Sequence, residues 1–191
     1  MKEIIDEAVR VLREGGVILY PTDTIWGIDC DATNEAAVAK VFEIKRRSEA
    51  KSLVVLAADL DMVARYIKQI PSIAIDLVEV NDAPMTIVYP GAQGLAPNVV
   101  AEDGSVGIRI PLNEFCVELC RRFRKPLVST SANVSGEPAP SCFAEIDAVI
   151  RESWTGAHPA SSRLAPPGGR RRSSSSGSAE KWKSSARKPC T

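Results

Sequence analysis

Short apolar runs alternate with helical periodicity along residues 3–130, and this alternation is the strongest constraint on the fold. The apolar runs are typical of buried strands and occupy residues 17–20, 53–57, 85–89, 106–110 and 126–130. Around them, apolar residues recur every three or four positions over residues 3–13, 34–44, 60–67, 71–80 and 113–124. The pattern predicts an α/β domain with helices packed on a sheet. No helical pattern separates 85–89 from 106–110, which predicts a partly antiparallel sheet.

The end of the chain differs in composition from the rest. Residues 163–191 hold eight Lys or Arg and one Glu, a net charge of +7, whereas residues 1–162 hold 16 basic and 23 acidic residues, a net charge of −7. From about Ala157 almost no branched apolar residue remains, so this segment cannot bury enough surface to offset its ordering entropy. We predict one folded domain over 1–157 and a low-complexity basic tail over 158–191, either disordered or translated out of frame.

The N-terminus and the cysteines bear on the cellular compartment. The first residues are charged throughout, and no apolar run approaches the roughly 20 residues of a membrane span, which predicts a cytoplasmic protein. The five cysteines are scattered and form no CxxC pair. They therefore predict reduced thiols, rather than a disulfide framework or a metal site.

Polar stretches follow two of the expected strands directly. "PTDT" occupies residues 21–24 after the first strand, and "STSAN" occupies residues 129–133 at the end of the last. Ligands of α/β proteins gather beyond strand ends, where loops offer side chains and backbone N–H groups together. Each stretch taken singly is also compatible with ordinary turn chemistry.

A third polar stretch, "EIKRRSEAKS" (43–52), is basic. Lys45 and Arg47 are two residues apart, so in an extended segment their side chains would point the same way. An Arg fork beside a Lys point charge suits a polyphosphate, although a solvated basic turn is the simpler interpretation. The chain contains neither a GxxxxGK[ST] loop nor a GxGxxG turn after a strand, so the common nucleotide-binding loops are absent from the sequence.

Five stretches in order carry a resemblance to a known family. "GGVILYPTDTIWGIDCDA", "KRR" with a following Lys, "PMTIVYPG", "SVGIRIP" and "KPLVSTSANVSGEPAP" resemble the YrdC family. The resemblance implies a twisted mixed sheet, parallel and antiparallel, with flanking helices around a deep basic cleft. It also implies a nucleotidyltransferase, L-threonylcarbamoyladenylate synthase, which makes threonylcarbamoyl-AMP and pyrophosphate from L-threonine, bicarbonate and ATP for tRNA threonylcarbamoyladenosine synthesis.

The resemblance assigns roles to residues of the motifs. The family's KxR and SxN pairs correspond to Lys45 with Arg47, and to Ser131 with Asn133, and the first pair would carry the catalysis. ATP would be bound by Lys45, Arg47, Lys51, Ser105, Ser129, Ser131 and Asn133. Thr24 and Arg109 would bind threonine. Mg²⁺ would be held mainly through the ATP phosphates, because the sequence shows no carboxylate cage.

Two features depart from the family. "APMT" (83–86) stands where the family has "GPLT", which matters only if the backbone needs a positive φ there. The segment "HPASSRLAPPGG" only echoes a threonine-contacting segment, so Ser161 and Ser162 are doubtful ligands, and the apolar strand that usually follows is missing. This loss would reduce activity and could leave a sheet edge uncovered.

Two rival interpretations remain at this point. The same fold could be a double-stranded RNA or tRNA-binding module without synthetase activity, in which the basic residues contact phosphates. The acidic domain argues against that module. The second rival is a domain that forms carbamoyl-AMP, as in the hydrogenase-maturation carbamoyltransferases. Those domains occur in much longer chains. Expected partners are the three substrates, the downstream tRNA threonylcarbamoyl-transferase machinery and a weakly bound tRNA, but no membrane.

Overall fold

The computed structural model describes residues 2–21, 25–46, 53–140 and 142–153. The strands are β1 (Ile18–Pro21), β2 (Trp26–Asp31), β3 (Val54–Leu56), β4 (Thr86–Tyr89), β5 (Val106–Arg109) and β6 (Leu127–Ser131). The helices are α1 (Lys2–Arg13), α2 (Glu35–Ile44), α3 (Leu60–Tyr66), α4 (Ser72–Val80), α5 (Glu114–Phe123) and α6 (Ala148–Ser153). Short 3₁₀ turns cover Pro97–Val99 and Phe143–Glu145. The expected tail, 158–191, lies outside the described residues.

The strands form one mixed sheet in the order β1-β2-β6-β3-β5-β4. Neighbouring strands pair antiparallel except β3 and β5, which are parallel. The prediction of a mixed α/β sheet is therefore confirmed, including the antiparallel pairing of 85–89 with 106–110. β1 and β4 are the two edge strands of the described sheet.

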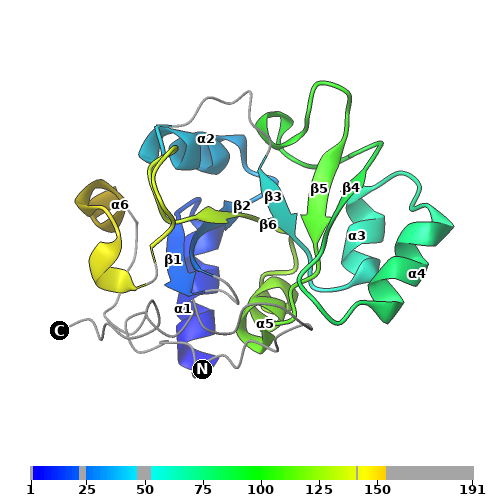
Figure 1. Ribbon diagram of the computed structural model, residues 1–191, viewed down its shortest axis with the longest axis horizontal. Coiled ribbons are helices and arrows are strands. Elements are labelled where there is room, and N and C mark those ends of the chain that lie inside the picture. The colour runs from blue at the N-terminus through cyan, green and yellow to red at the C-terminus, as the bar shows by residue number, and fades with distance from the viewer. Residues whose placement is uncertain (1, 22–24, 47–52, 141, 154–191) are drawn as a thin grey trace, which may run out of the picture.

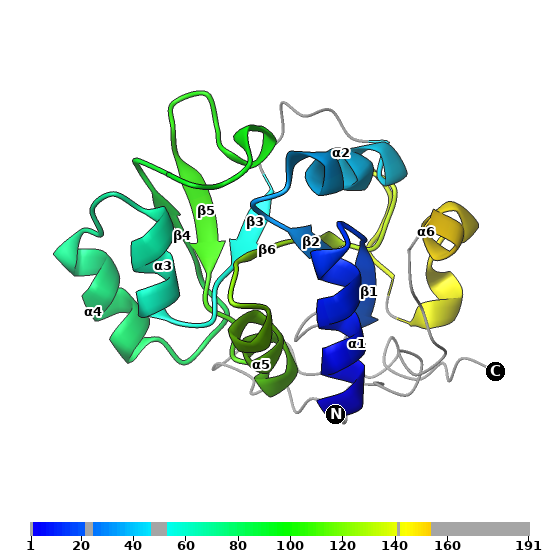
Figure 2. The same ribbon diagram turned by 180° about the vertical axis from the view of Figure 1, so that it is seen from behind.

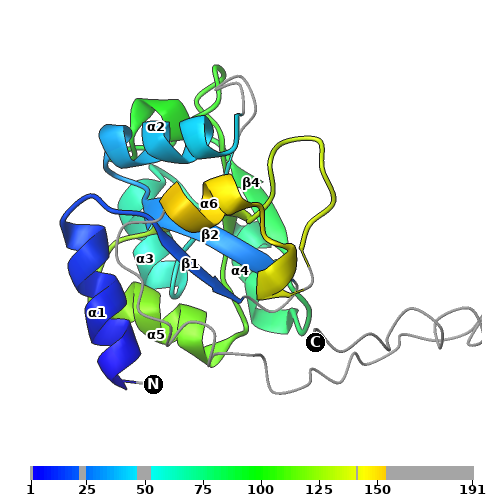
Figure 3. The same ribbon diagram turned by 90° about the vertical axis from the view of Figure 1, so that its left-hand side faces the viewer.

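The helices lie around this sheet in separate groups. α1 and α5 pack against one another on one side of β1 and β2, and α2 lies on the other side (Figure 3). α3 and α4 flank β4 and β5 at the far end of the sheet from α6, as Figures 1 and 2 show from opposite sides. One continuous apolar core fills the space between sheet and helices. Within the described residues no helix has the length and hydrophobicity to cross a membrane.

The sequence did not predict β2, although all six of its residues are buried. Its sequence, WGIDCD, contains a glycine and two aspartates, which are all disfavoured in strands. Asp31 is kept buried by an ion pair with Lys125, whose Nζ lies 2.7 Å from Asp31 Oδ2. A buried strand with acidic residues depends on partners that are distant in the sequence, so the apolar pattern alone does not reveal it.

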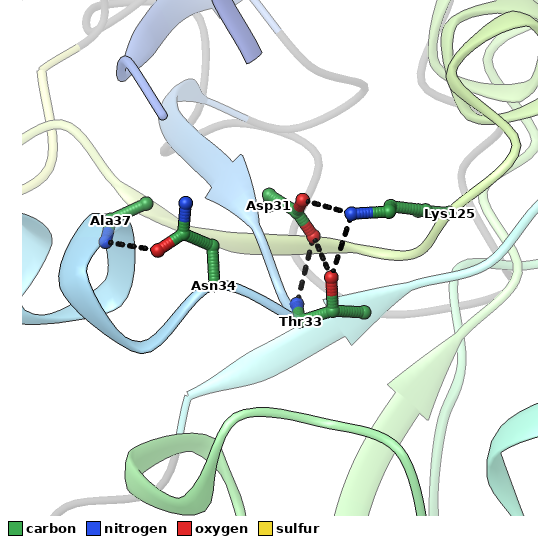
Figure 4. Close-up of polar contacts among 5 residues, drawn as sticks. All are labelled: Asp31, Thr33, Asn34, Ala37 and Lys125. Atoms are coloured by element: carbon green, nitrogen blue, oxygen red, sulfur yellow. Dashed lines mark hydrogen bonds and ion pairs between the residues drawn. The ribbon is translucent and has the colours of Figure 1, made fainter. Parts of the chain in front are cut away.

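The end of β2 leads directly into α2 through a polar cluster (Figure 4). The backbone N–H and the hydroxyl of Thr33 both donate to Asp31 Oδ1, at 2.8 and 2.7 Å. The N-cap of α2 is Asn34, whose Oδ1 accepts from Ala37 N at 3.2 Å. The cap satisfies a free N–H of the first turn and sets the direction in which α2 crosses the sheet.

The cysteines differ from the expectation in one case. Cys30, Cys116 and Cys120 are free and buried, as predicted for reduced thiols. Cys142 is disulfide-bonded. The prediction of reduced thiols throughout is therefore wrong for Cys142, because the spacing of the cysteines does not reveal which of them form a bridge.

A buried hydrogen bond between a phenol and a carboxyl group joins β1 to β2. Asp29 is fully buried, and its Oδ2 accepts a hydrogen bond from Tyr20 Oη at 2.5 Å. Asp29 pairs across the sheet with Ser129, whose hydroxyl also interacts with the carboxyl group. Burial raises the pKa of Asp29 to about 7, although the bonds from Tyr20 and Ser129 lower it. The folded protein therefore binds a proton here that the unfolded chain releases.

We predict that Asp29→Asn flattens the dependence of stability on pH. Below about pH 4 the Asp29 carboxyl is protonated in both states, whereas above its raised pKa folding must bury a carboxylate. Unfolding free energy should thus fall by a few kcal/mol between about pH 4 and 7, at about 1.4 kcal/mol per unit of pKa shift. Denaturant titrations across this range should show a smaller slope for Asp29→Asn and a more stable variant at pH 8. Asp76→Asn, at an exposed position, is the control, and equal slopes in Asp29→Asn and wild type would refute the prediction.

Candidate functional site

The basic stretch after α2 has a different backbone from the one that its spacing suggested. Lys45 is the C-cap of α2 with helical dihedrals, φ −79° and ψ −6°. Arg46 then has a φ of 48°, in the left-handed region. Lys45 and Arg46 are therefore not extended, and the expectation of a shared direction with Arg47 loses its basis. The helix ends here because Arg46 leaves the helical conformation.

Lys45 turns inward and is 1% exposed. Its Nζ donates to the carbonyl oxygen of Ser131 and, at 2.7 Å, to that of Asn133. Ser131 Oγ and Asn133 Oδ1 lie 3.5 and 3.4 Å from the same nitrogen. In return, Ser135 N donates to the carbonyl oxygen of Lys45 at 3.0 Å. We call Lys45 with the loop 131–135 the lysine clasp. It brings Lys45 of the KxR pair to Ser131 and Asn133 of the SxN pair, while Arg47 lies outside the described residues.

The polar run at the end of β6 carries the chain out of the core. Leu127 and Val128 are buried, whereas residues 129–131 are half-buried. Ser131 pairs with Gly27 of β2, and Ala132 N donates to Trp26 O at 2.8 Å, so β2 guides the chain past its last strand residue. The Asn133 side-chain amide donates to the carbonyl oxygen of Glu137, which orders the following turn. The Ser131 hydroxyl and the Asn133 amide thus lie beside Lys45 on a loop that is held by hydrogen bonds.

Arg109 lies at the end of β5, one strand from the edge of the sheet. It pairs with Thr86 of β4, and its Nε donates to Thr86 Oγ1 at 3.0 Å. Arg109 is half-buried, and none of the ion pairs between described residues involves it. Thr86 belongs to the motif "PMTIVYPG", but the sequence alone indicates no role for it. Only the pairing of β4 with β5 places Thr86 beside Arg109.

The sheet register places Ser129 and Arg109 on one face. Directly paired residues present their side chains on the same side of a sheet. Ser129 pairs with Val54, and Val54 pairs with Gly107. Gly107 is two residues before Arg109 on β5, so the side chains of Ser129 and Arg109 are on the same face. On the same face, Val54, Leu56 and Gly107 lie between them.

Ser105 lies in the turn before β5. Its N–H donates to Asp103 Oδ1 at 2.9 Å, and its carbonyl oxygen accepts from Ala101 N at 2.9 Å. Hydrogen bonding from Ser105 lowers the pKa of the exposed Asp103 carboxyl. Ser105 is thus held in a compact turn at the end of the sheet where β6 finishes.

Several sequence-predicted residues lie outside the described part of the chain: Thr24, Arg47, Lys51, Ser161 and Ser162. Their roles stay predictions, as does the depth of the basic cleft. Within the described residues the structure brings Lys45 to Ser131 and Asn133. It places Arg109 and Ser129 on one face of the sheet.

Comparisons with known proteins show the family of this chain. Residues 10–157 match the Sua5/YciO/YrdC family, described as telomere recombination. The chain belongs to this family. Two relatives are named threonylcarbamoyl-AMP synthase. That of Stenotrophomonas maltophilia is 38% identical over 151 residues, or 77% of this chain and 81% of the relative. That of Xanthomonas euvesicatoria is 35% identical over 164 residues, or 80% and 87%.

One solved structure has the same fold as this chain. The P. abyssi Sua5 complexed with L-threonine matches with a TM-score of 0.72 at 27% identity. The match covers 80% of this chain and 44% of Sua5, so this chain spans less than half the length of that protein. The family and the mixed α/β fold expected from the motifs are therefore confirmed.

The lysine clasp predicts a stability cost for Lys45→Met. The variant keeps the length of the side chain but removes a buried cation that donates to two carbonyls. A hydrogen bond to a charged group contributes about 1.5–3 kcal/mol, so unfolding free energy should fall by about 2 kcal/mol. Lys40→Met is the matched control, since the exposed Lys40 on the same helix donates to Gly15 O at 3.0 Å.

Urea denaturation measures both variants. We expect Lys40→Met to change unfolding free energy by about 0.5 kcal/mol or less, as is usual at exposed positions. A Lys45→Met variant no less stable than Lys40→Met would mean that the clasp does not hold the loop.

Proposed function

We propose that this chain is a threonylcarbamoyl-AMP synthase, which joins L-threonine, bicarbonate and ATP and releases pyrophosphate. The observation that carries the proposal is the lysine clasp, because it holds Lys45 of one motif against Ser131 and Asn133 of another. The shared family and the relatives bearing this enzyme's name over most of the chain support it. The P. abyssi structure with L-threonine supports an amino acid substrate.

Lys45 would act on ATP through its charge. Its ammonium already donates to the loop carbonyls, so a further direct bond to phosphate would compete with the clasp. A buried cation at low dielectric still stabilises nearby negative charge strongly. Ser131 and Asn133, braced by the clasp, would offer neutral hydrogen bonds to the nucleotide. Arg47 and Lys51 would add charge from the segment that follows α2.

Arg109 would bind the threonine carboxylate. Its Nε is occupied by Thr86, which leaves the terminal guanidinium nitrogens to form a two-pronged contact with a carboxylate. Thr24 would contact the rest of the amino acid, and Ser105 and Ser129 would lie on the ATP side.

The reaction itself needs no protein nucleophile. The amine of threonine takes up carbon dioxide to give N-carboxythreonine, whose carboxylate oxygen attacks the α-phosphate of ATP while pyrophosphate leaves. Positioning and charge neutralisation would supply the catalysis. Among the described residues no cluster of three acidic, His or Cys side chains could hold a metal. The hydroxyl and amide oxygens of Ser131 and Asn133 are compatible with Mg²⁺, which would be held mainly by phosphate oxygens.

The cellular setting follows from the proposed reaction. The product would pass to the tRNA threonylcarbamoyl-transferase machinery in the cytoplasm, with weak tRNA binding at most. A tRNA-binding module without synthetase activity is the alternative. It would show tRNA binding without turnover.

The test is pyrophosphate release from ATP in bicarbonate buffer. We expect release to require L-threonine, and Arg109→Gln to raise the KM for threonine about tenfold or more, as expected when a charged hydrogen bond is lost. Arg65→Gln, at an exposed position on α3, should match the wild type. Release that is independent of threonine would refute the proposed function. An unchanged KM in Arg109→Gln would refute only the assignment of Arg109.

A further inference from the structure

The helix α4 exposes most of its apolar side chains. Five of its nine residues are Ile, Leu or Val, yet Ala74 is its only buried residue. Ile73, Leu77 and Val80 are 62%, 41% and 79% exposed. Their spacings of four and three residues place them on one side of the helix, which makes a continuous apolar stripe. We call these three residues the α4 stripe.

The two borders of the α4 stripe differ in character. At 100° per residue, Ala74 and Val78 lie on one border, where Val78 and Leu112 line an apolar groove against β4 and β5. Asp76 and Glu79 lie on the other border and are exposed. The stripe is therefore apolar on its groove side and acidic on its solvent side.

The surrounding chain is also acidic. Residues 69–108 contain no Lys or Arg. Their acidic residues are Asp76, Glu79, Asp82, Glu102 and Asp103. This span covers α4, β4 and the turn before β5, at the end of the sheet opposite α6 (Figure 1). The charged residues of this span are thus all of one sign, and the nearest basic residues along the chain are Lys68 and Arg109 just beyond its two ends.

We propose that the α4 stripe is a docking surface for an amphipathic helix of a partner protein, with apolar residues along one stripe and Lys or Arg beside them. An exposed apolar stripe of this kind marks an interaction site, and a helix is the usual occupant of such a surface. The acidic border selects a basic flank on the partner. The proposal does not use the nucleotide site and does not rest on the proposed reaction.

The charge argues against two other occupants. A second copy docked by antiparallel α4 helices would place the Asp76–Glu79 border against the same border of its partner, where like charges repel. RNA would bring phosphates to a surface without any Lys or Arg between 69 and 108. A basic helix is the occupant that matches both the apolar and the acidic part.

The test uses a fluorescein-labelled peptide with leucine along one helical stripe and lysine elsewhere. We expect fluorescence anisotropy to show binding to the wild type, and Leu77→Lys and Val80→Lys to weaken it about tenfold or more, which corresponds to about 1.4 kcal/mol. Val149→Lys is the matched control, since it makes the same change at an exposed apolar residue on α6 and should bind as the wild type does. Thermal melting and threonine-dependent turnover should be unchanged in all three variants.

Three outcomes would overturn the proposal. One is equal loss of binding in Val149→Lys and Leu77→Lys, which would mean that general charge governs the peptide. A second is equal binding of a peptide with glutamate in place of lysine. The third is concentration-dependent dimerisation of the wild type that Leu77→Lys abolishes, since a second copy would then cover the stripe.

Discussion

The buried ammonium of Lys45 is the constraint on which the candidate site depends. A cation removed from water is costly unless polar groups converge on it. Here the carbonyls of Ser131 and Asn133 converge, so the end of α2 and the loop after β6 must stay together. β2 precedes α2 and pairs with β6, so the clasp closes a unit made of two adjacent strands and one helix. The site is thereby tied to the core.

The strands that the sequence revealed are those that consist mainly of apolar residues. β2 was missed because the burial of Asp29 and Asp31 depends on Tyr20 and Lys125, and the apolar pattern contains no sign of these pairs. The extended conformation considered for the stretch after α2 does not hold at Lys45, for a related reason. Spacing gives a direction only when the local conformation is known, and here the helix continues to its C-cap at Lys45.

The motifs identified the family, but they did not show how the candidate residues meet. Thr86 and Arg109 are 23 residues apart, and only the pairing of β4 with β5 places them together. Lys45 and the "STSAN" loop are likewise distant in the sequence, and the structure shows that they are in direct contact. The charges near the lysine clasp differ from those near the α4 stripe. Basic residues follow one another at the end of α2, while the charged residues of the span 69–108 are all acidic.

The central claim is that the lysine clasp forms the nucleotide site, and a crystal structure with a non-hydrolysable ATP analogue and L-threonine tests it most directly. The account predicts that the phosphates lie against the loop 131–135 with Lys45 still buried behind it, and that the threonine carboxylate contacts Arg109. A nucleotide bound instead at the opposite end of β2, beside Asp31 and Lys125, would contradict the account.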